Sequence, residues 1–509
     1  MGKEYFDKNK KDLLMRYFER CAPEQEGIDA QRLQQALEKL AHPRYGAQAL
    51  MVLRHGKVVG ESYRAPYREG DLHSLFSVSK SFTAVAAGFA QQEGLLTLED
   101  FLCDYFPEYL PSLPCENMRQ LRLKHLLMMA AGFEAAPDDF KRHHAGEVVN
   151  DFPYSYANFK FSDEIDWAKD FLHTYVAEQP GNRFIYSSAC TYMISAVIQK
   201  ITGQTLLEFL QPRLLKPLGI TCVQWQQCSQ GRNVGGWGMS LCSEDLAKFG
   251  QFMLQEGAWE GKQLLDPAFV REMRSCQILI GNRSAKWEKR FGYQVWLLGE
   301  EEDYGGIGAF GQMYIVFPRL EAVFVMLGAS RTYMKALDVI MGDLKNALQG
   351  PAEPGESVSL ELDQMYLPEG LSSWDMPQAQ RYTGMRYVLA PNPFGITAMK
   401  FQFGAQDQLN LEIEGDATEV KIGYDYWEYG HIAAHETIYS DTHTQMLFSK
   451  VACAGAWKGE VYHLTLAFYE TCYVLELACR FSEHGIYIES KRNVGFVKEA
   501  NTKLIGVRA

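Results

Sequence analysis

The sequence lacks the features of several large protein classes. The 509-residue chain has no run of 18 or more apolar residues, so we expect no transmembrane helix. Its 50 Lys and Arg against 63 Asp and Glu give a formal net charge of −13, which argues against binding to nucleic acid. The N-terminal segment is charged, with neither an apolar core nor a small-residue cleavage site, unlike a secretory signal. We therefore expect a cytoplasmic protein that binds neither nucleic acid nor a membrane.

Patterns typical of disulfides and metal sites are also missing. The 11 cysteines are scattered and nowhere form CxxC, which favours reduced, mostly buried thiols. His431, His435 and His443 lie close together in the sequence, but there is no HExxH and the surroundings have the pattern of strands and turns. We interpret these histidines as polar residues of a sheet or its loops, and we predict no metal and no cofactor.

Two enzyme signatures are absent or misplaced. The chain has no GxSxG, which excludes an α/β-hydrolase nucleophile elbow. Residues 306–311 match GxGxxG, but the dinucleotide fingerprint requires a helix directly after the glycines, and here a strand pattern follows. We interpret this stretch as a glycine-rich edge strand that lets a substrate approach the backbone, with an N–H available as donor.

Hydrophobic periodicity predicts a first domain over residues 1–350. Its predicted elements are a helix over 24–41, a β-hairpin over 47–64, a helix over 80–93, a mostly helical body over 95–255, strands over 291–298, 312–318 and 322–329, and a helix over 331–348. The hairpin and first helix therefore rejoin strands near residue 330, with a helical subdomain inserted between them. This organisation predicts an α+β fold.

The rest of the chain predicts a separate domain. A segment rich in proline and glycine, taken as a linker over 351–374, precedes strand-like segments over 375–509 that alternate apolar and polar residues. This pattern is typical of an antiparallel sheet or barrel. We interpret its many aromatic residues as a filled core rather than a carbohydrate or lipid cavity. They are Phe401, Phe403, Tyr424, Tyr426, Trp427, Tyr429, Trp457, Tyr462 and Phe468.

The stretch Ser77-Val78-Ser79-Lys80 is the first candidate for catalysis. In the first turn of a helix, Ser77 and Lys80 share a face, and the free N–H groups point outward. A serine hydroxyl becomes a nucleophile when a base takes its proton, and a lysine is such a base if burial lowers its pKa toward neutrality. The alternative is a serine that caps the helix and a lysine on the surface.

A second candidate is Tyr186, which follows a Pro-Gly turn and precedes an amphipathic helix. A tyrosine near an ammonium group can be held as phenolate or can pass the serine proton to the leaving group. Taken alone, Tyr186 would be an ordinary half-buried aromatic residue. The segment Tyr-Ala-Asn at 156–158 has neither the turn nor the helix, so we do not assign it to the site.

These motifs occur in an order that resembles the serine β-lactamase and penicillin-binding-protein superfamily, in its class C-like branch of esterases, D-aminopeptidases and 6-aminohexanoate-dimer hydrolases. The resemblance covers about residues 22–348 and includes the segments "PEQEGIDAQRL", "SLFSVSKSFTA", "PGNRFIYSS", "LLKPLGI" and "GAFGQMYIVFP". It implies an antiparallel sheet flanked by helices, with a helical subdomain.

The resemblance also implies roles for individual residues. Ser77 would be the acylated nucleophile, with Lys80 and Tyr186 as its base. Ser188 would stand at the third position of the tyrosine motif, and Gly306, Ile307 and Gly308 would correspond to the Lys-Thr-Gly strand element. The backbone N–H groups of Ser77 and Ala309 would form the oxyanion hole. The site residues that the resemblance implies are thus Ser77, Lys80, Tyr186, Ser188, Gly306, Gly308 and Ala309.

Two departures from the family pattern bear on the substrate. Ser188 replaces an asparagine and Gly306 replaces a Lys or His, which are side chains that hold β-lactam substrates in the antibiotic-degrading members. We therefore expect a serine hydrolase acting on a small ester or amide through an acyl-enzyme. The alternatives are a β-lactamase or a D-Ala-D-Ala carboxypeptidase, or a silent binding module on the same fold.

Overall fold

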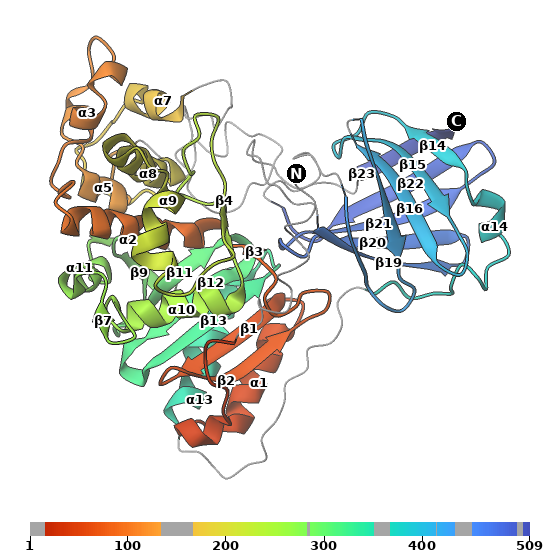
Figure 1. Ribbon diagram of the computed structural model, residues 1–509, viewed down its shortest axis with the longest axis horizontal. Coiled ribbons are helices and arrows are strands. Elements are labelled where there is room, and N and C mark those ends of the chain that lie inside the picture. Colours follow the sequence, from red (N-terminus) through yellow and green to blue (C-terminus); the bar gives the residue numbers. More distant parts are fainter. Residues whose placement is uncertain are drawn as a thin grey trace.

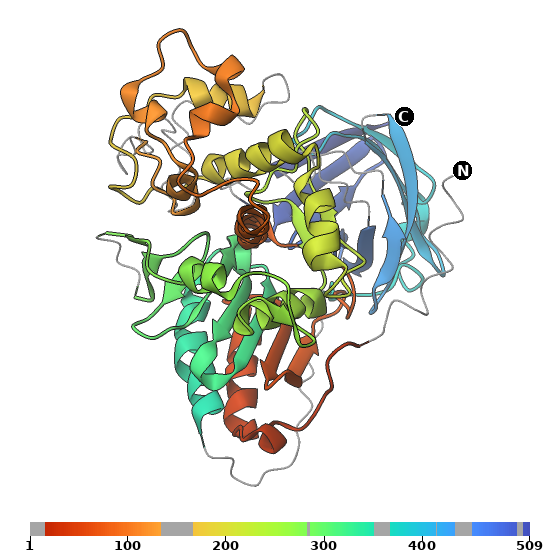
Figure 2. The ribbon, with the colours of Figure 1, turned by 60° about the vertical axis from the view of Figure 1, so that its left-hand side comes forward.

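Two antiparallel sheets organise the chain. The computed structural model describes residues 16–133, 166–281, 286–350, 367–413, 415–432, 450–495 and 502–509. In Figure 1 the first sheet lies below a helical part, and the second, barrel-like sheet lies on the right. Figure 2, turned by 60°, again shows the helical part above the first sheet, with the barrel beside both.

The first sheet has eight strands in the order β2-β1-β13-β12-β11-β10-β9-β8. The strands are β1 (Ala47–Arg54), β2 (Lys57–Tyr63), β8 (Ile278–Leu279), β9 (Glu288–Phe291), β10 (Trp296–Leu298), β11 (Tyr304–Gly308), β12 (Gln312–Phe317) and β13 (Ala322–Gly328). The pairing of β1 with β13 joins the beginning of this domain to its end. Residues 47–53 of β1 are all buried, because α1 (Ala30–Ala41) and α10 (Ser243–Leu254) both pack on this strand. The predicted hairpin and the strands at 312–318 and 322–329 are confirmed.

Two element boundaries and one position in the sheet differ from the sequence-based prediction. The helix expected from residue 24 begins at Ala30, because Gly27 adopts a left-handed φ of 72° and ends the 3₁₀ turn η1 (Pro23–Glu26). The strand expected over 291–298 is divided between β9 and β10. A side chain at Gly292 would lie 2.1 Å from the Met273 carbonyl oxygen, which shows how closely the chain turns there. Strand β11 is not an edge strand, since it lies between β10 and β12.

A helical part covers the end of the sheet where the candidate residues gather. Its helices are α2 (Ser79–Gln92), α3 (Leu102–Tyr105), α4 (Glu116–Arg119), α5 (Leu123–Leu127), α7 (Trp167–His173), α8 (Ser188–Thr202), α9 (Leu206–Leu210) and the π-helical turn η4 (Gln211–Leu215). Helix α2 packs against both α8 and α9, and its residues 79–90 are all buried. Below it lie α11 (Pro267–Met273) and the small strands β6 (Ala258–Trp259) and β7 (Lys262–Gln263). Three short strands, β3 (His73–Ser74), β4 (Gln224–Trp225) and β5 (Met239–Leu241), form a small sheet that leads into α2.

The domain closes with helical turns from Tyr333 to Gln349. They are η7 (Tyr333–Lys335), α12 (Ala336–Asp338), the π-helical turn η8 (Val339–Leu344) and α13 (Lys345–Gln349). Both η8 and α13 pack on α1.

The second sheet is a nearly closed barrel of ten strands in the order β17-β16-β15-β14-β23-β22-β21-β20-β19-β18. The strands are β14 (Arg386–Leu389), β15 (Ile396–Gln402), β16 (Asp407–Ile413), β17 (Asp416–Ile422), β18 (Glu428–His431), β19 (Lys450–Lys458), β20 (Val461–Ala467), β21 (Val474–Phe481), β22 (Gly485–Arg492) and β23 (Thr502–Arg508). Gly423 closes much of the gap, because its carbonyl accepts from the Gly455 N–H at 2.8 Å. The short helix α14 (Ala379–Tyr382) precedes β14.

The barrel core is filled by part of the predicted aromatic set. Phe401, Phe403, Trp457, Tyr462 and Phe468 are buried there. Tyr424, Tyr426 and Tyr429 are instead 37 to 45% exposed. Trp427 is also buried, in a separate smaller cluster. The aromatic prediction therefore holds for the five core residues, while the three tyrosines lie partly in solvent.

Two further sequence predictions can be compared with the structure. All 11 cysteines lie in the described residues and none forms a disulfide. In the same residues, no helix combines the length and the apolar character that crossing a membrane would require.

Candidate active site

Ser77 lies in a 3₁₀ turn, η2 (Phe76–Val78), immediately before α2. The turn is fixed from both sides. The Leu75 N–H donates to the Met239 carbonyl at 2.8 Å, and the Ser79 hydroxyl donates to the Phe76 carbonyl at 2.6 Å. Phe76 has a left-handed φ of 47°, a conformation that costs a non-glycine residue about 1 kcal/mol or more. Ser77 is partly exposed although its neighbours are buried, so part of this residue is open to solvent.

Lys80 points inward from the first turn of α2, as the sequence suggested. It is 2% exposed, and its Nζ donates to Ser77 Oγ at 3.1 Å, to Ser188 Oγ at 2.9 Å and to the Gly236 carbonyl at 2.5 Å. Within the described ranges, no carboxylate forms an ion pair with this ammonium group. Burial therefore lowers the pKa of Lys80 from 10.5 to about 7.

The three acceptors also determine what the neutral amine does. The Gly236 carbonyl can only accept, so it keeps one N–H of Lys80, and Ser188 Oγ can accept a second. The nitrogen lone pair then faces the remaining neighbour, Ser77 Oγ. The neutral form of Lys80 is thus oriented to take the proton of Ser77.

Tyr186 lies two residues before α8, and its side chain is 2% exposed. The Lys80 Nζ is 5.0 Å from the centroid of the tyrosine ring. On its other side the ring stacks on Trp296, at a centroid distance of 5.8 Å and an interplanar angle of 17°. The structure therefore brings Tyr186 to the same lysine as Ser77 and Ser188.

Strand β11 places the glycines of the predicted oxyanion element against the start of α2. A Cβ atom at Gly308 would lie 2.4 Å from the Leu75 carbonyl oxygen and 3.3 Å from the Ser77 nitrogen. Ala309, the next residue, is partly exposed like Ser77. In the described part of the chain, the N–H groups of Ser77 and Ala309 donate to no backbone carbonyl. Both groups are available to a ligand.

Gly306 is placed differently. Strand β11 turns this residue into the interior, where a Cβ atom would lie 2.5 Å from the Tyr314 ring and 3.2 Å from Ser81 Oγ. The position has no room for a lysine or a histidine. Gly306 and Gly308 therefore allow other parts of the protein, rather than a substrate, to approach the backbone of β11 closely.

Sequence reasoning missed one member of the cluster, the Gly236 carbonyl. A side chain at Gly236 would lie 3.0 Å from both the Cβ and the carbonyl oxygen of Ser188. The neighbouring Gly235 and Gly238 have left-handed φ values of 66° and 84°. The run Gly-Gly-Trp-Gly at 235–238 was the available signal, because such runs mark a close approach of backbone.

The remaining candidates are not part of this cluster. His431 ends β18 in the barrel, and His435 and His443 lie outside the described residues, as does the Tyr-Ala-Asn segment at 156–158. Among the residues that the structure describes, no group of three or more His, Cys, Asp or Glu side chains is arranged to hold a metal ion.

Comparison with known proteins gives a match that agrees with this geometry. The family model described as Beta-lactamase matches residues 32–339, which is more than half of the chain. The 6-aminohexanoate-dimer hydrolase of Paenarthrobacter ureafaciens is 27% identical over 305 residues, which cover 58% of this chain and 75% of that protein. A protein of Salmonella agona, provisionally assigned as a D-alanyl-D-alanine carboxypeptidase, is 23% identical over 221 residues. These cover 39% of this chain and only 49% of that protein.

Solved structures show the same fold. A protein from Bacillus anthracis, provisionally assigned as a 6-aminohexanoate-dimer hydrolase, superposes with a TM-score of 0.54 at 20% identity, covering 66% of this chain and 88% of that one. EstCE1, a hydrolase with promiscuous acyltransferase activity, superposes with a TM-score of 0.50 at 18% identity, covering 63% and 98% respectively.

Proposed function

The chain belongs to the β-lactamase family, and from this premise we propose that it is a serine hydrolase that acts on a small ester or amide through an acyl-enzyme. The observation that carries the proposal is the buried Lys80 amine, which lies 3.1 Å from Ser77 Oγ without an opposing carboxylate among the described residues. A lysine in this environment is neutral for much of the time near neutral pH, as a general base must be.

Acylation begins when Ser77 Oγ attacks the carbonyl carbon of the substrate. Its proton passes to the lone pair of Lys80 Nζ as the new C–O bond forms. The carbonyl oxygen becomes an oxyanion and accepts from the N–H groups of Ser77 and Ala309, which are preorganised by η2 and by the end of β11.

The intermediate then collapses and the bond to the leaving group breaks. The leaving alkoxide or amine takes a proton that Lys80 delivers, with Tyr186 as relay. Deacylation repeats the steps with water, whose proton goes to Lys80 as its oxygen attacks the ester carbon. The acid is released and Ser77 recovers its proton.

The geometry favours an uncharged substrate. Position 306 cannot carry a cation, because its Cβ would meet Tyr314 and Ser81. Ser188 Oγ is used by Lys80 and is too short to copy the amide contact of an asparagine. A relative named 6-aminohexanoate-dimer hydrolase supports cleavage of an amide bond.

We propose that residues 1–350 form the hydrolase domain, that 351–374 are a linker and that 375–509 form a second domain. The proposed substrate is a small molecule, and neither nucleic acid nor a membrane is a proposed partner. The proposed location is the cytoplasm.

Replacement of the nucleophile tests the proposal. We expect Ser77→Ala to leave less than about 1% of the kcat/KM for short-chain p-nitrophenyl esters, a loss of at least roughly 2.7 kcal/mol of transition-state stabilisation. A fluorophosphonate probe should label the wild type at Ser77 and not the variant. Thermal unfolding of both proteins is the control for folding. An unlabelled wild type would support the silent binding module.

The same assay separates the substrate classes. We expect nitrocefin to be hydrolysed at least about a hundredfold less efficiently than the esters, a gap of roughly 2.7 kcal/mol. Equal kcat/KM for both would restore the β-lactamase alternative. Release of D-alanine from a D-Ala-D-Ala peptide, faster than ester hydrolysis, would restore the carboxypeptidase alternative.

A further inference from the structure

The barrel reaches the proposed oxyanion hole through one turn, residues 468–473, which joins β20 to β21. The turn is fixed internally: the Thr471 hydroxyl donates to the Phe468 carbonyl at 2.8 Å and accepts from the Tyr473 N–H at 2.9 Å. The Phe468 N–H in turn donates to the Tyr473 carbonyl at 3.0 Å. Tyr473 is 2% exposed, so this end of the barrel presents a buried, preorganised ring.

That ring contacts the two phenylalanines next to the oxyanion donors. Phe76 precedes Ser77, and Phe310 follows Ala309. The Tyr473 ring lies 6.3 Å from Phe76 and 6.1 Å from Phe310, and the two phenylalanines lie 5.5 Å apart, all edge to face. Both phenylalanines pack in the barrel core rather than in the core of the hydrolase domain.

The same two phenylalanines have unfavourable backbone conformations. The φ of Phe76 is 47° and that of Phe310 is 63°. A non-glycine residue stays in the left-handed region only when its surroundings fix it there. The φ of Phe76 orients the Phe76–Ser77 peptide, which carries the Ser77 N–H, relative to the chain before it. The φ of Phe310 fixes the course of the chain directly after Ala309 and so restricts where Ala309 can lie.

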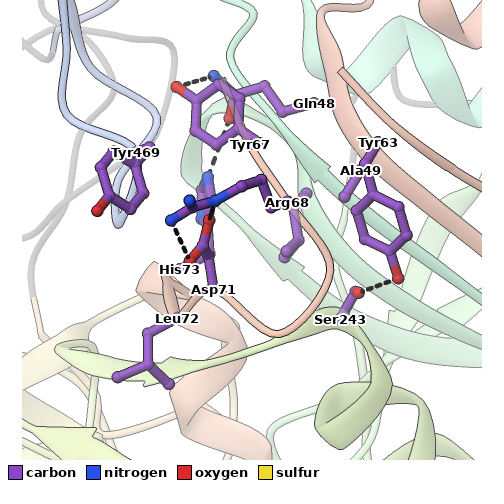
Figure 3. A pocket seen from close by; sticks show the side chains of 11 residues that line it. Gln48, Ala49, Tyr63, Tyr67, Arg68, Asp71, Leu72, His73, Ser243 and Tyr469 are labelled. Atoms are coloured by element: carbon purple, nitrogen blue, oxygen red, sulfur yellow. Dashed lines mark hydrogen bonds and ion pairs between the residues drawn. The ribbon is translucent and has the colours of Figure 1, made fainter. Parts of the chain in front are cut away.

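A second set of contacts anchors the barrel beside this element. The Ser74 N–H donates to the Glu470 carbonyl at 2.9 Å, only three residues before Ser77. Figure 3 shows the neighbouring pocket, with Tyr469 of the barrel opposite Arg68 and His73 of the hydrolase domain. The Arg68 guanidinium lies 5.2 Å from the Tyr469 ring centroid and is paired with Asp71 at 3.0 Å.

A buried polar chain lines this pocket. His73 Nε2 lies 2.9 Å from Gln48 Oε1, and Gln48 Nε2 donates to the Tyr67 hydroxyl at 2.6 Å (Figure 3). These contacts tie the segment that leads to Ser77 to strand β1 on one side, while Glu470 ties it to the barrel on the other. The segment therefore has little freedom to adjust if the barrel moves.

We propose that Tyr473 is a positioning residue of the hydrolase, and that the barrel turn 468–473 holds the two oxyanion donors in register by packing against Phe76 and Phe310. The inference rests on the proposed function and adds to it a role for the barrel. A donor displaced by a fraction of an ångström stabilises the oxyanion poorly, while substrate binding elsewhere in the site is unchanged. The barrel thus acts on the chemical step rather than on affinity.

The test compares three full-length variants with the wild type. Tyr473→Ala removes the ring, and Tyr473→Phe keeps the ring and removes only the hydroxyl. Tyr387→Ala is the matched control, since Tyr387 is an equally buried tyrosine of the barrel on β14, and its ring packs on Phe481 at a centroid distance of 5.8 Å. Ester hydrolysis gives kcat and KM, fluorophosphonate labelling gives the rate of reaction at Ser77, and thermal unfolding gives the folded fraction.

For Tyr473→Ala we expect kcat and the labelling rate to fall about 30- to 100-fold, with KM within about threefold of the wild type. The pH midpoint of kcat/KM should stay in place, because Lys80 keeps its surroundings. Tyr473→Phe should restore kcat to within about threefold, and Tyr387→Ala should keep wild-type kcat per folded molecule.

Two results would overturn the inference alone: an unchanged kcat in folded Tyr473→Ala, or an equal loss in Tyr387→Ala. If the unchanged kcat came with a raised KM, the turn would serve substrate binding instead. A wild type that neither hydrolyses esters nor takes label at Ser77 would overturn the proposed function and this inference together.

Discussion

Lys80 and Lys345 are both buried lysines of the same domain, and their surroundings differ in one respect. Lys345 on α13 faces two carboxylates, with Nζ 2.6 Å from Asp303 and 2.8 Å from Glu301. Lys80 on α2 faces two hydroxyl groups and a carbonyl. Burial acts on both, but at Lys345 the carboxylates outweigh it and raise the pKa, whereas at Lys80 burial lowers the pKa to about 7.

The comparison distinguishes a lysine with a structural role, Lys345, from a lysine that can act as a general base, Lys80. A lysine with carboxylate partners keeps its proton, and its removal leaves those carboxylates buried without a cation. A lysine whose described partners are all uncharged gives up its proton near neutral pH and can act as a base, at a cost in stability. We therefore expect substitution of Lys345 to lower stability and to leave activity nearly unchanged. We expect substitution of Lys80 to remove activity without lowering stability.

The largest difference is expected in activity. Arginine keeps a positive charge but cannot give up its proton, so Lys80→Arg should lower kcat/KM for an ester by about 10⁴-fold, roughly 5.4 kcal/mol. Lys345→Arg keeps the charge that its carboxylates require and should stay within about threefold of the wild type. Near-normal rates in folded Lys80→Arg would show that Lys80 is an electrostatic support and Tyr186 the only base.

The second difference is expected in the free energy of unfolding. Lys345→Met leaves Asp303 buried without its cation and should destabilise the protein by about 3–5 kcal/mol. Lys80→Met removes an amine whose folded pKa, about 7, lies below its unfolded value of 10.5. Because the unfolded chain binds this proton more tightly, Lys80→Met should stabilise the protein most below pH 7.

The sign of this gain can be checked by denaturant unfolding at several pH values. The gain from Lys80→Met should shrink as the pH rises from 7 to 10.5, where both states lose the proton. Destabilisation by Lys80→Met at pH 6 would contradict the assignment of a desolvated lysine.

The smallest expected effect is in the pH dependence of the wild type. Since the neutral amine is the base, kcat/KM should rise about tenfold per pH unit below pH 7 and level off above it. An ester whose leaving group does not titrate in this range gives the measurement. Lys345→Met should keep the midpoint, and a midpoint near 10 or a flat profile would exclude Lys80 as the base.

The sequence predicted those parts of the site that local geometry fixes. Ser77 and Lys80 are three residues apart, so one helical turn places them on one face wherever the helix lies. The hairpin of β1 and β2 and the strands β12 and β13 were equally readable, because each has a continuous apolar pattern. The Pro-Gly turn and the following helix made Tyr186 a candidate, and a family resemblance gave this residue its role and added the two oxyanion donors.

The parts that depend on packing could not be predicted. The Gly236 carbonyl reaches Lys80 from a segment 156 residues away, and the glycine run around it indicates a close approach of backbone without indicating the partner. The position of β11 inside the sheet could not be recognised from the sequence, because glycine-rich strands are also common at the edges of sheets. The contact of Tyr473 with Phe76 joins two domains, each of which had a complete pattern of its own.

The pairing of β1 with β13 has a consequence for biosynthesis. Residues 47–54 leave the ribosome early but cannot complete their sheet until residues 322–328 have been made. At about 5–20 residues per second this delay is on the order of ten seconds or more, during which the apolar face of the hairpin has no partner strand. The first sheet, and with it the arrangement of the nucleophile and the oxyanion donors, is therefore complete only after translation has passed its last strand.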